Sequence, residues 1–238
     1  QIHLKVDTGM GRAGVWEDDA ESIAGKIANE LPAIRIVGFA SHLAVADEDA
    51  VYTRGQLARF NALVPRLRAT ANVEAPAHIL NSAGVIGFPE SAGDMIRPGL
   101  MLYGVAPQPE FQPNLRAALT WKTRVALVRE VGLGRSISYG RTYITPRPMR
   151  AASLAAGYAD GYRRTLSGNN AEVLIGGRRC ALLGRVTMDQ IVVDVSALPG
   201  VAAGDEAILL GRQDNEEITA TEMARKAGTI PWEIFTGI

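Results

Sequence analysis

The sequence predicts an α/β domain followed by a mostly-β domain. In its first half, strand-like and helix-like segments alternate, a pattern typical of a parallel sheet covered by helices. After residue 118, short strand-like runs are separated by Gly, Pro and Asn, as in an all-β domain. The stretch Gln108–Pro113, rich in Pro and polar residues, lies between the two patterns, so the predicted domains are 1–113 and 114–238.

The composition is that of a globular protein without an unusual charge. The chain has 238 residues, of which 47% are hydrophobic and 21% charged, and its formal net charge is zero. A neutral chain argues against nucleic acid or a membrane surface as the main partner. The single cysteine, Cys180, excludes an internal disulfide and a cysteine zinc site, and fits a reducing compartment. No apolar run is long enough to span a bilayer, and we predict no metal site.

The first half contains the segments expected to place a ligand. We predict strands at Ile2–Asp7, Ile34–Ala40, His78–Ser82 and Met95–Gly104, and helices at Glu17–Leu31 and Asp49–Thr70. The second helix carries one apolar face, formed by Leu57, Phe60, Leu63, Val64 and Leu67. Ligands of parallel sheets and barrels lie at the carboxyl ends of the strands. The candidate polar residues at these ends are Arg12, His42, Asn81, Ser82 and Arg97.

The second half is predicted to be mostly strand. The strand-like runs are Leu119–Val131, Ser136–Ile144, Arg150–Ala156, Glu172–Ile175, Arg179–Leu183, Gln190–Val195 and Ala207–Leu210. One helix is expected at Thr219–Ala227, with Thr219 as its N-cap and Glu222 three residues later.

A glycine-rich turn follows the first strand. The spacing Gly9-x-Gly11-x-x-Gly14 matches the dinucleotide-binding fingerprint. Two features argue against a nicotinamide cofactor: Lys5 and Asp7 interrupt the apolar pattern of the strand, and the next strand ends without an acid for a ribose hydroxyl. Considered alone, the pattern favours a tight turn with a solvated Arg12 over a nicotinamide site.

Seven segments, in order, resemble motifs of the alanine racemase family, and together they cover nearly the whole chain. They are Lys5–Arg12 (KVDTGMGR), Ser41–Glu48 (SHLAVADE), His78–Ala83 (HILNSA), Asp94–Gly104 (DMIRPGLMLYG), Ser138–Tyr143 (SYGRTY), Gly157–Arg164 (GYADGYRR) and Gly184–Gln190 (GRVTMDQ). The resemblance implies a fold-type III enzyme that uses pyridoxal 5′-phosphate (PLP). The expected fold is the second half of a (β/α)8 TIM-type barrel followed by a β-rich C-terminal domain.

The resemblance also implies an activity and a setting. The expected reaction is the interconversion of L-alanine and D-alanine, which supplies D-alanine for peptidoglycan. The expected assembly is a cytoplasmic homodimer with shared active sites, whose partner molecule is a small amino acid. A broader amino-acid racemase and a non-catalytic PLP-binding fragment remain alternatives.

In the first half, the resemblance implies roles for the strand-end residues. Arg97 would lie at the pyridine nitrogen, where other PLP enzymes carry an acid, which argues against a decarboxylase. Arg12 would contact the phenolic oxygen of the cofactor and the substrate carboxylate, and Lys5 could be carbamylated and hold Arg12. His42 would link to Arg97 and tune the catalytic tyrosine. The other expected cofactor contacts are Asn81, Ser82, Gly99 and Leu100.

In the second half, Tyr139 is the expected acid/base, acting in the site of the other subunit. Met188 and Asp189 would line the substrate pocket and Tyr158 its entrance. Arg164 would hold residues of the site in place without contacting the substrate itself. Trp232 stands where the family usually has a tyrosine that contacts the cofactor phosphate. Tryptophan can only donate a hydrogen bond, so this contact is a departure from the pattern.

The lysine that binds the cofactor covalently has no match in this sequence. Lys5 matches a different position, and Lys26, Lys122 and Lys226 lie on a helix or in the β-rich half. We therefore expect that the sequence lacks both the N-terminal part of the barrel and the extreme C-terminus of an intact racemase. On this expectation, the activity of the chain alone is doubtful.

Overall fold

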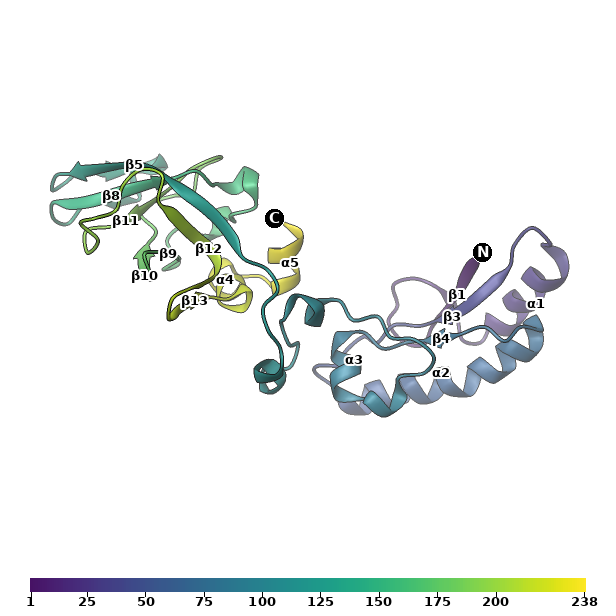
Figure 1. The fold of residues 1–238 in the computed structure, drawn as a ribbon. Helices are drawn as coiled ribbons and strands as arrows, with labels where there is room; N and C mark the ends of the chain where they lie inside the picture. Colours follow the sequence, from purple (N-terminus) through teal and green to yellow (C-terminus); the bar gives the residue numbers. More distant parts are fainter. The chain divides into compact units, whose positions relative to one another are not determined.

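The computed structural model describes all residues, 1–238, and divides the chain into two compact units, Gln1–Arg116 and Ala117–Ile238. The division falls close to the boundary predicted after residue 113. In Figure 1, the first unit runs from purple to blue and carries the long helices, whereas the second runs from teal to yellow and is mostly strand.

The first unit contains a parallel sheet, as predicted. Its strands are β1 (Ile2–Asp7), β2 (Val15–Trp16), β3 (Ile36–Ala40) and β4 (Ala77–His78), in the order β2-β1-β3-β4. Every neighbouring pair is parallel. The carboxyl ends of β1, β3 and β4 therefore meet at one edge of the sheet, where the candidate residues follow.

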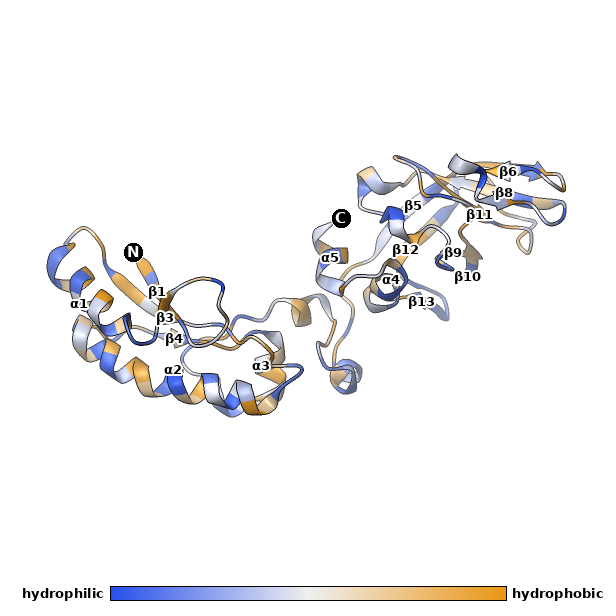
Figure 2. Cartoon of the chain, turned by 180° about the vertical axis from the view of Figure 1, so that it is seen from behind, coloured by the Kyte–Doolittle hydropathy of each residue, from blue (hydrophilic) through white to orange (hydrophobic).

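Three α-helices accompany this sheet: α1 (Ala20–Glu30), α2 (Ala50–Ala71) and α3 (Ser82–Gly87). The predicted apolar face of α2 is confirmed, because its residues Leu57, Phe60, Leu63, Val64 and Leu67 are buried in one core with Leu4 and Val6 of β1 and Phe39 of β3. Figure 2 shows this pattern as alternating orange and blue bands along α2. Asp49 caps the helix by accepting a hydrogen bond from the N–H of Tyr52 at 2.9 Å.

Two strand predictions in the first unit are wrong. Of His78–Ser82, only His78 belongs to a strand, because Asn81 caps α3 and the chain becomes helical. The predicted strand Met95–Gly104 contains the 3₁₀-helix η2 (Leu100–Tyr103) and no strand. Pro98 lacks an N–H group, and the N–H groups of Gly99 and Met101 bond the hydroxyl of Ser82, so this segment cannot form a ladder. The other 3₁₀-helices of this unit are η1 (Pro89–Ser91) and η3 (Pro109–Asn114).

The second unit is built on an antiparallel sheet. Its strands are β5 (Trp121–Val131), β8 (Met149–Leu154), β9 (Glu172–Ile175), β10 (Arg178–Ala181), β11 (Ile191–Asp194) and β12 (Glu206–Gln213), with β13 (Glu216–Ile218) paired to β12. A separate hairpin joins β6 (Ser136–Ile137) and β7 (Tyr143–Ile144). The predicted run Ser136–Ile144 is thus two short strands with the 3₁₀-turn η4 (Tyr139–Arg141) between them.

Two α-helices close the second unit. Helix α4 (Ala220–Ala227) begins as predicted, with the hydroxyl of Thr219 accepting from the N–H of Glu222. The short helix α5 (Pro231–Thr236) was not predicted. The remaining 3₁₀-turns are η5 (Tyr158–Asp160) and η6 (Arg164–Leu166). No helix in the chain combines the length and the apolar character needed to cross a membrane.

A cluster of ion pairs joins the sheet of the second unit to α4. The guanidinium of Arg179 pairs with Glu172 of β9, Glu216 of β13 and Glu222 of α4. Lys226 of α4 pairs with Glu172 and Glu222 as well. Each carboxylate therefore has a cationic partner, and the cluster fixes α4 against the strands.

The packing of α2 gives a first testable prediction. Replacing the fully buried Leu67 by alanine should lower the free energy of unfolding by about 2–5 kcal/mol, because it removes buried apolar atoms and leaves a cavity. Replacing Val51, which is 80% exposed on the same helix, should change it by less than about 0.5 kcal/mol. Urea unfolding measures both values. Equal losses in the two variants would contradict the packing of α2 described here.

Candidate active site

The glycine-rich turn after β1 is organised around the carboxylate of Asp7. Its Oδ1 accepts hydrogen bonds from the N–H groups of Gly9, Met10 and Gly11 at 2.9, 2.8 and 3.1 Å. Its Oδ2 accepts one from the N–H of Arg12 at 3.1 Å. Because these donors already have an acceptor, the turn does not offer them to a phosphate. The structure therefore argues against the dinucleotide-binding interpretation.

The same hydrogen bonds set the ionisation of Asp7. Burial alone would raise the pKa of this carboxyl, but the four N–H donors outweigh burial and hold the pKa of Asp7 below its usual value. Asp7 is therefore ionised at neutral pH, and its charge holds the turn in shape. The turn also carries Arg12, so the position of the Arg12 backbone depends on this carboxylate.

The guanidinium of Arg97 lies where the carboxyl ends of β3 and β4 meet. Its Nη2 donates to the backbone oxygens of Ser41 at 2.6 Å and Ile79 at 3.4 Å, and to Nδ1 of His42 at 3.3 Å. Its Nη1 donates to the backbone oxygen of His78 at 3.2 Å and to Nδ1 of the same residue. The Nε–H group of Arg97 has no acceptor within the protein. The predicted link between Arg97 and His42 is present.

All three histidines of the chain belong to this network. Nε2 of His78 lies 2.7 Å from Nδ1 of His3. An arginine can only donate, so Nδ1 of both His42 and His78 must be an acceptor. His78 then carries its proton on Nε2 and donates it to His3. Sequence reasoning named His42 but assigned no role to His78 or His3.

Both acceptor histidines are kept neutral. The pKa of His78 is lowered to about 4, mainly by burial and next by the charge of Arg97. The pKa of His42 is also lowered to about 4, by burial and then by the charges of Arg97, Arg12 and Lys5. The last two charges belong to Arg12 and Lys5, two residues that the sequence predicts in the same site as His42.

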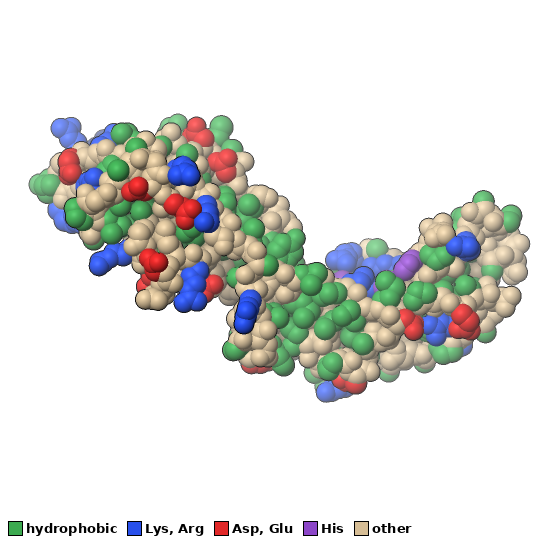
Figure 3. Space-filling model, viewed as in Figure 1, with side chains coloured by type: hydrophobic (Ala, Val, Ile, Leu, Met, Phe, Trp, Pro, Cys, Tyr) green, Lys and Arg blue, Asp and Glu red, His purple; other side chains and the backbone are tan.

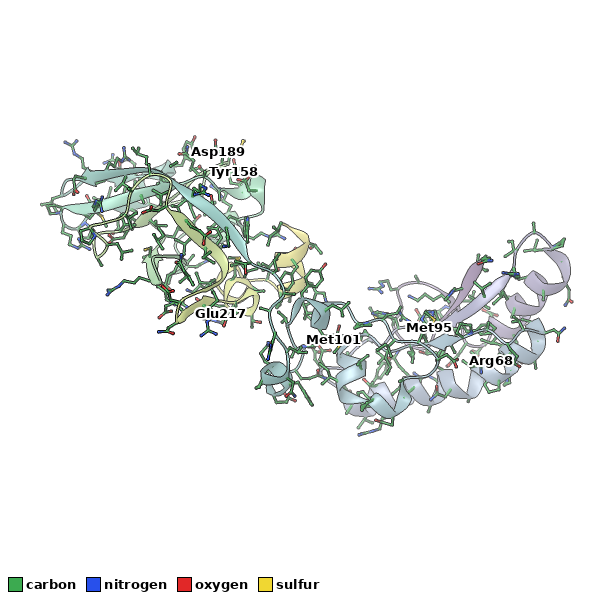
Figure 4. The ribbon with its side chains drawn as sticks, viewed as in Figure 1. Arg68, Met95, Met101, Tyr158, Asp189 and Glu217 are labelled. Carbon is green, nitrogen blue, oxygen red and sulfur yellow. The ribbon has the colours of Figure 1, made fainter.

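Neither Lys5 nor Arg12 forms an ion pair with a carboxylate. Figure 3 shows Lys and Arg side chains gathered with histidine on one face of the first unit. Figure 4 shows the same unit with Met95 labelled beside the strands, two residues before Arg97. This edge of the sheet therefore carries unpaired positive charge, which suits an anionic ligand.

Ser82 and Gly99 lie together, as predicted. The hydroxyl oxygen of Ser82, at the start of α3, accepts from the N–H groups of Gly99 at 2.8 Å and Met101 at 3.3 Å. Leu100, which separates these two residues, is buried. Asn81 uses its side chain to cap α3. Both of these N–H groups are therefore bonded within the cluster, and the hydroxyl hydrogen of Ser82 is the donor that the cluster can offer to a phosphate oxygen.

In the second unit, Tyr139 projects from a strained turn, and 71% of its surface is exposed. Ser138 before it has φ of 63° and ψ of −176°, Gly140 after it has φ of 71°, and Arg141 has φ of 51°. Side chains rarely tolerate such angles, and strained backbone of this kind clusters at functional sites. The hydroxyl of Ser138 donates to the backbone oxygen of Arg185 at 2.5 Å, which holds the turn in place.

The segments that carry Tyr158, Met188 and Asp189 are joined by their backbones. The N–H of Tyr158 donates to the oxygen of Thr187 at 2.9 Å. A Cβ on Gly157 would lie 2.3 Å from that oxygen, so only glycine allows this approach. Figure 4 shows Tyr158 and Asp189 next to one another in the second unit. The three predicted substrate residues thus share one surface.

Two further predicted residues also lie in the second unit. Trp232 occupies the first turn of α5, directly after Pro231, and is 43% exposed. Arg164 begins η6, and its backbone oxygen accepts from the hydroxyl of Ser167 at 2.6 Å. The roles implied for Trp232 and Arg164 stay predictions.

Comparison with known proteins assigns both units. Residues 1–107 match the sequence model of the N-terminal domain of alanine racemase, and residues 118–238 match that of its C-terminal domain. The chain belongs to the alanine racemase family. The predicted fold class, a barrel-type α/β part followed by a mostly-β alanine racemase domain, is therefore confirmed.

Individual family members agree along the whole chain. The chain is 46% identical to the alanine racemase of Halothermothrix orenii and 48% identical to that of Symbiobacterium thermophilum, in each case over 100% of the chain and 63% of the relative. The crystal structure of alanine racemase from Streptomyces lavendulae superposes with a TM-score of 0.91 at 38% identity, covering 100% of the chain and 64% of that structure. That of Bacillus anthracis, which has bound L-Ala-P, gives 0.89 at 35% identity, covering 99% and 61%. The chain thus spans about 63% of the length of its curated relatives.

The role of Asp7 gives a prediction about acid stability. Asp7→Asn should lower the free energy of unfolding at pH 7 by about 1.5–3 kcal/mol, since hydrogen bonds to a charged acceptor are lost. The folded-state pKa of Asp7 is depressed, so its contribution is complete above the ordinary value near 3.8 and disappears as the pH falls through the folded-state value. The variant should therefore lose less stability than the parent on acidification.

The control for this experiment is Asp18→Asn, because Asp18 is exposed. Thermal unfolding at a series of pH values measures all three proteins. The role of Asp7 is wrong if Asp7→Asn and Asp18→Asn behave alike.

Proposed function

We propose that the full-length gene product interconverts L-alanine and D-alanine with PLP as its cofactor. The observation that carries the proposal is the set of hydrogen bonds made by the guanidinium of Arg97. Its Nη1 and Nη2 groups donate to the ends of β3 and β4, whereas its Nε–H has no acceptor. A fixed guanidinium with one free donor suits an aromatic ring nitrogen that accepts a hydrogen bond.

The other residues of the first unit fit the remaining parts of PLP. The hydroxyl hydrogen of Ser82, whose oxygen already accepts from the N–H groups of Gly99 and Met101, suits the phosphate, and Leu100 and Asn81 lie within the same cluster. The unpaired charge of Arg12 suits the phenolic oxygen of the cofactor and the carboxylate of the substrate. When bound, PLP withdraws electrons from the substrate and makes its α-hydrogen acidic.

The role of Arg97 follows from its ordinary chemistry. Burial lowers the pKa of Arg97, but an arginine starts from so high a pKa that it stays protonated at any physiological pH. It therefore donates a hydrogen bond to a ring nitrogen but does not transfer a proton to it. His42 and His78 are neutral, so each accepts a hydrogen bond from Arg97 and holds its orientation without adding a second positive charge.

Tyr139 is the proposed acid/base on one face of the substrate. Racemisation needs two proton-transfer groups on opposite faces of the α-carbon. The exposed hydroxyl of Tyr139 on a strained turn supports this role, and Tyr158, Met188 and Asp189 would line the same pocket. We propose that these groups act in the site of the other subunit of a homodimer. Trp232 would replace the usual tyrosine near the phosphate.

Lys5 is proposed to carry a carbamate. No carboxylate pairs with Lys5 or Arg12, so two cations act on His42 without a compensating anion from the protein. A carbamate on Lys5 would supply that anion and hold the guanidinium of Arg12. We also propose a cytoplasmic location and a role in supplying D-alanine for peptidoglycan. The single cysteine, which is buried and unpaired, supports a reducing compartment.

The full-length protein, reconstituted with PLP, tests the proposed reaction. In deuterated water, L-alanine should exchange its α-proton for deuterium and form D-alanine. Both processes should be faster with L-alanine than with L-serine or L-lysine. Faster turnover of serine or lysine would favour the broader racemase, and no turnover of any amino acid would favour a non-catalytic PLP-binding protein.

Replacing Tyr139 by phenylalanine removes only the hydroxyl. Racemisation of L-alanine should fall by roughly 10²–10⁴-fold, the usual contribution of a general acid or base. Tyr143→Phe is the matched control, because Tyr143 lies in β7 of the same hairpin and its hydroxyl contacts only the sulfur of Met149 at 4.0 Å. A similar loss of activity in both variants, or in neither, contradicts the role of Tyr139.

A further inference from the structure

Helix α2 turns a row of polar side chains toward the loops that follow β1 and β3. Tyr52, Gln56 and Arg59 are spaced so that they share one side of the helix. The hydroxyl of Tyr52 donates to the backbone oxygen of Gly9 at 2.8 Å, and Nη2 of Arg59 donates to that of Thr8 at 2.6 Å. The loop after β1 is therefore bonded to α2 on consecutive residues.

The middle residue of this row, Gln56, bonds to both loops. Its side chain is completely buried, with 0% exposure. Oε1 accepts from the N–H of Ala44 at 2.9 Å, and Nε2 donates to the backbone oxygen of His42 at 3.1 Å. The same Nε2 lies 3.5 Å from the hydroxyl of Thr8, which in turn bonds the hydroxyl of Ser41 at 2.8 Å. One amide thus joins the ends of β1 and β3.

The fit between helix and loop is tight. A Cβ on Gly9 would lie 2.4 Å from the hydroxyl oxygen of Tyr52, so the loop could not approach α2 this closely with any other residue there. A buried amide that loses a partner carries the full cost of desolvation. Gln56 therefore opposes any change in the separation of the two loops.

These loops carry the charged and proton-accepting groups of the site. Arg12 follows Thr8 in the first loop, and His42 begins the second, where it accepts from Arg97 at 3.3 Å. We propose that Gln56 is a positioning residue that fixes where Arg12 and His42 lie relative to Arg97. The placement of Arg12 and His42 is a property of the fold. Its importance for substrate binding rests on the proposed function.

Amide hydrogen exchange of the protein tests the placement directly. Gln56→Met keeps most of the side-chain volume but removes every hydrogen bond to the loops. Exchange should accelerate about tenfold in residues 8–14 and 42–46, since each lost bond contributes on the order of a factor of ten, and should not change in residues 60–70 of α2. Gln56→Glu keeps the acceptor for Ala44 and loses the donor, so residues 8–14 should be affected more than Ala44.

The matched control is Leu57→Ala. Leu57 is the next residue of α2 and is buried in the core, without a side-chain hydrogen bond to either loop. This variant should accelerate exchange in the core helices rather than selectively in the loops. Unchanged loop exchange in Gln56→Met, or the same pattern in Gln56→Met and Leu57→Ala, overturns the inference.

A kinetic measurement on the full-length protein separates this inference from the proposed reaction. Gln56→Met should raise the KM for L-alanine more than it lowers kcat, because a displaced Arg12 weakens binding of the carboxylate, and Leu57→Ala should leave both unchanged at a temperature where it is folded. A parent protein without racemase activity would overturn the proposed function, while the exchange experiment would still decide the role of Gln56.

Discussion

The guanidinium of Arg97 connects the ends of two parallel strands, and the geometry of the site depends on that connection. It donates to backbone oxygens at the end of β3 and just after β4, and to the imidazoles of His42 and His78. The oxygen of Ser41 lies just after β3, and those of His78 and Ile79 lie at the end of β4 and just after it. One multidentate donor therefore holds the two strand ends together. Since arginine only donates, every group around it must be an acceptor, which fixes the protonation of both histidines.

Other polar contacts keep this arrangement from shifting. The carboxylate of Asp7 shapes the turn that carries Arg12, and the amide of Gln56 ties that turn to the loop that begins with His42. Each of these side chains is buried and has hydrogen-bond partners, so a displacement would leave a polar group without one. The positive charges of Lys5 and Arg12 remain without a protein carboxylate, and the site is therefore electrostatically prepared for an anion.

The sequence predicted the fold best where the pattern is local. The apolar spacing on α2 and the Thr219 N-cap of α4 each depend on neighbours within a turn or two, and both were confirmed. The segment Met95–Gly104 was predicted wrongly, because its N–H groups bond Ser82 and Leu80, and no local pattern reveals such partners. His3 and His78 were missed for the same reason, since 75 residues separate them in sequence. The roles proposed for Arg97 and Tyr139 come from the family motifs, because composition and periodicity do not indicate them.

The central claim is that Arg97 remains charged and surrounded by neutral acceptors. ¹⁵N NMR of the imidazole nitrogens, followed as a function of pH, measures this most directly. The structure predicts that His42 and His78 are both neutral at pH 7, with an unprotonated Nδ1, and that each gains a proton only near pH 4. An imidazolium signal from either residue at pH 7, or a protonation midpoint at the ordinary value of about 6.5, would contradict the account.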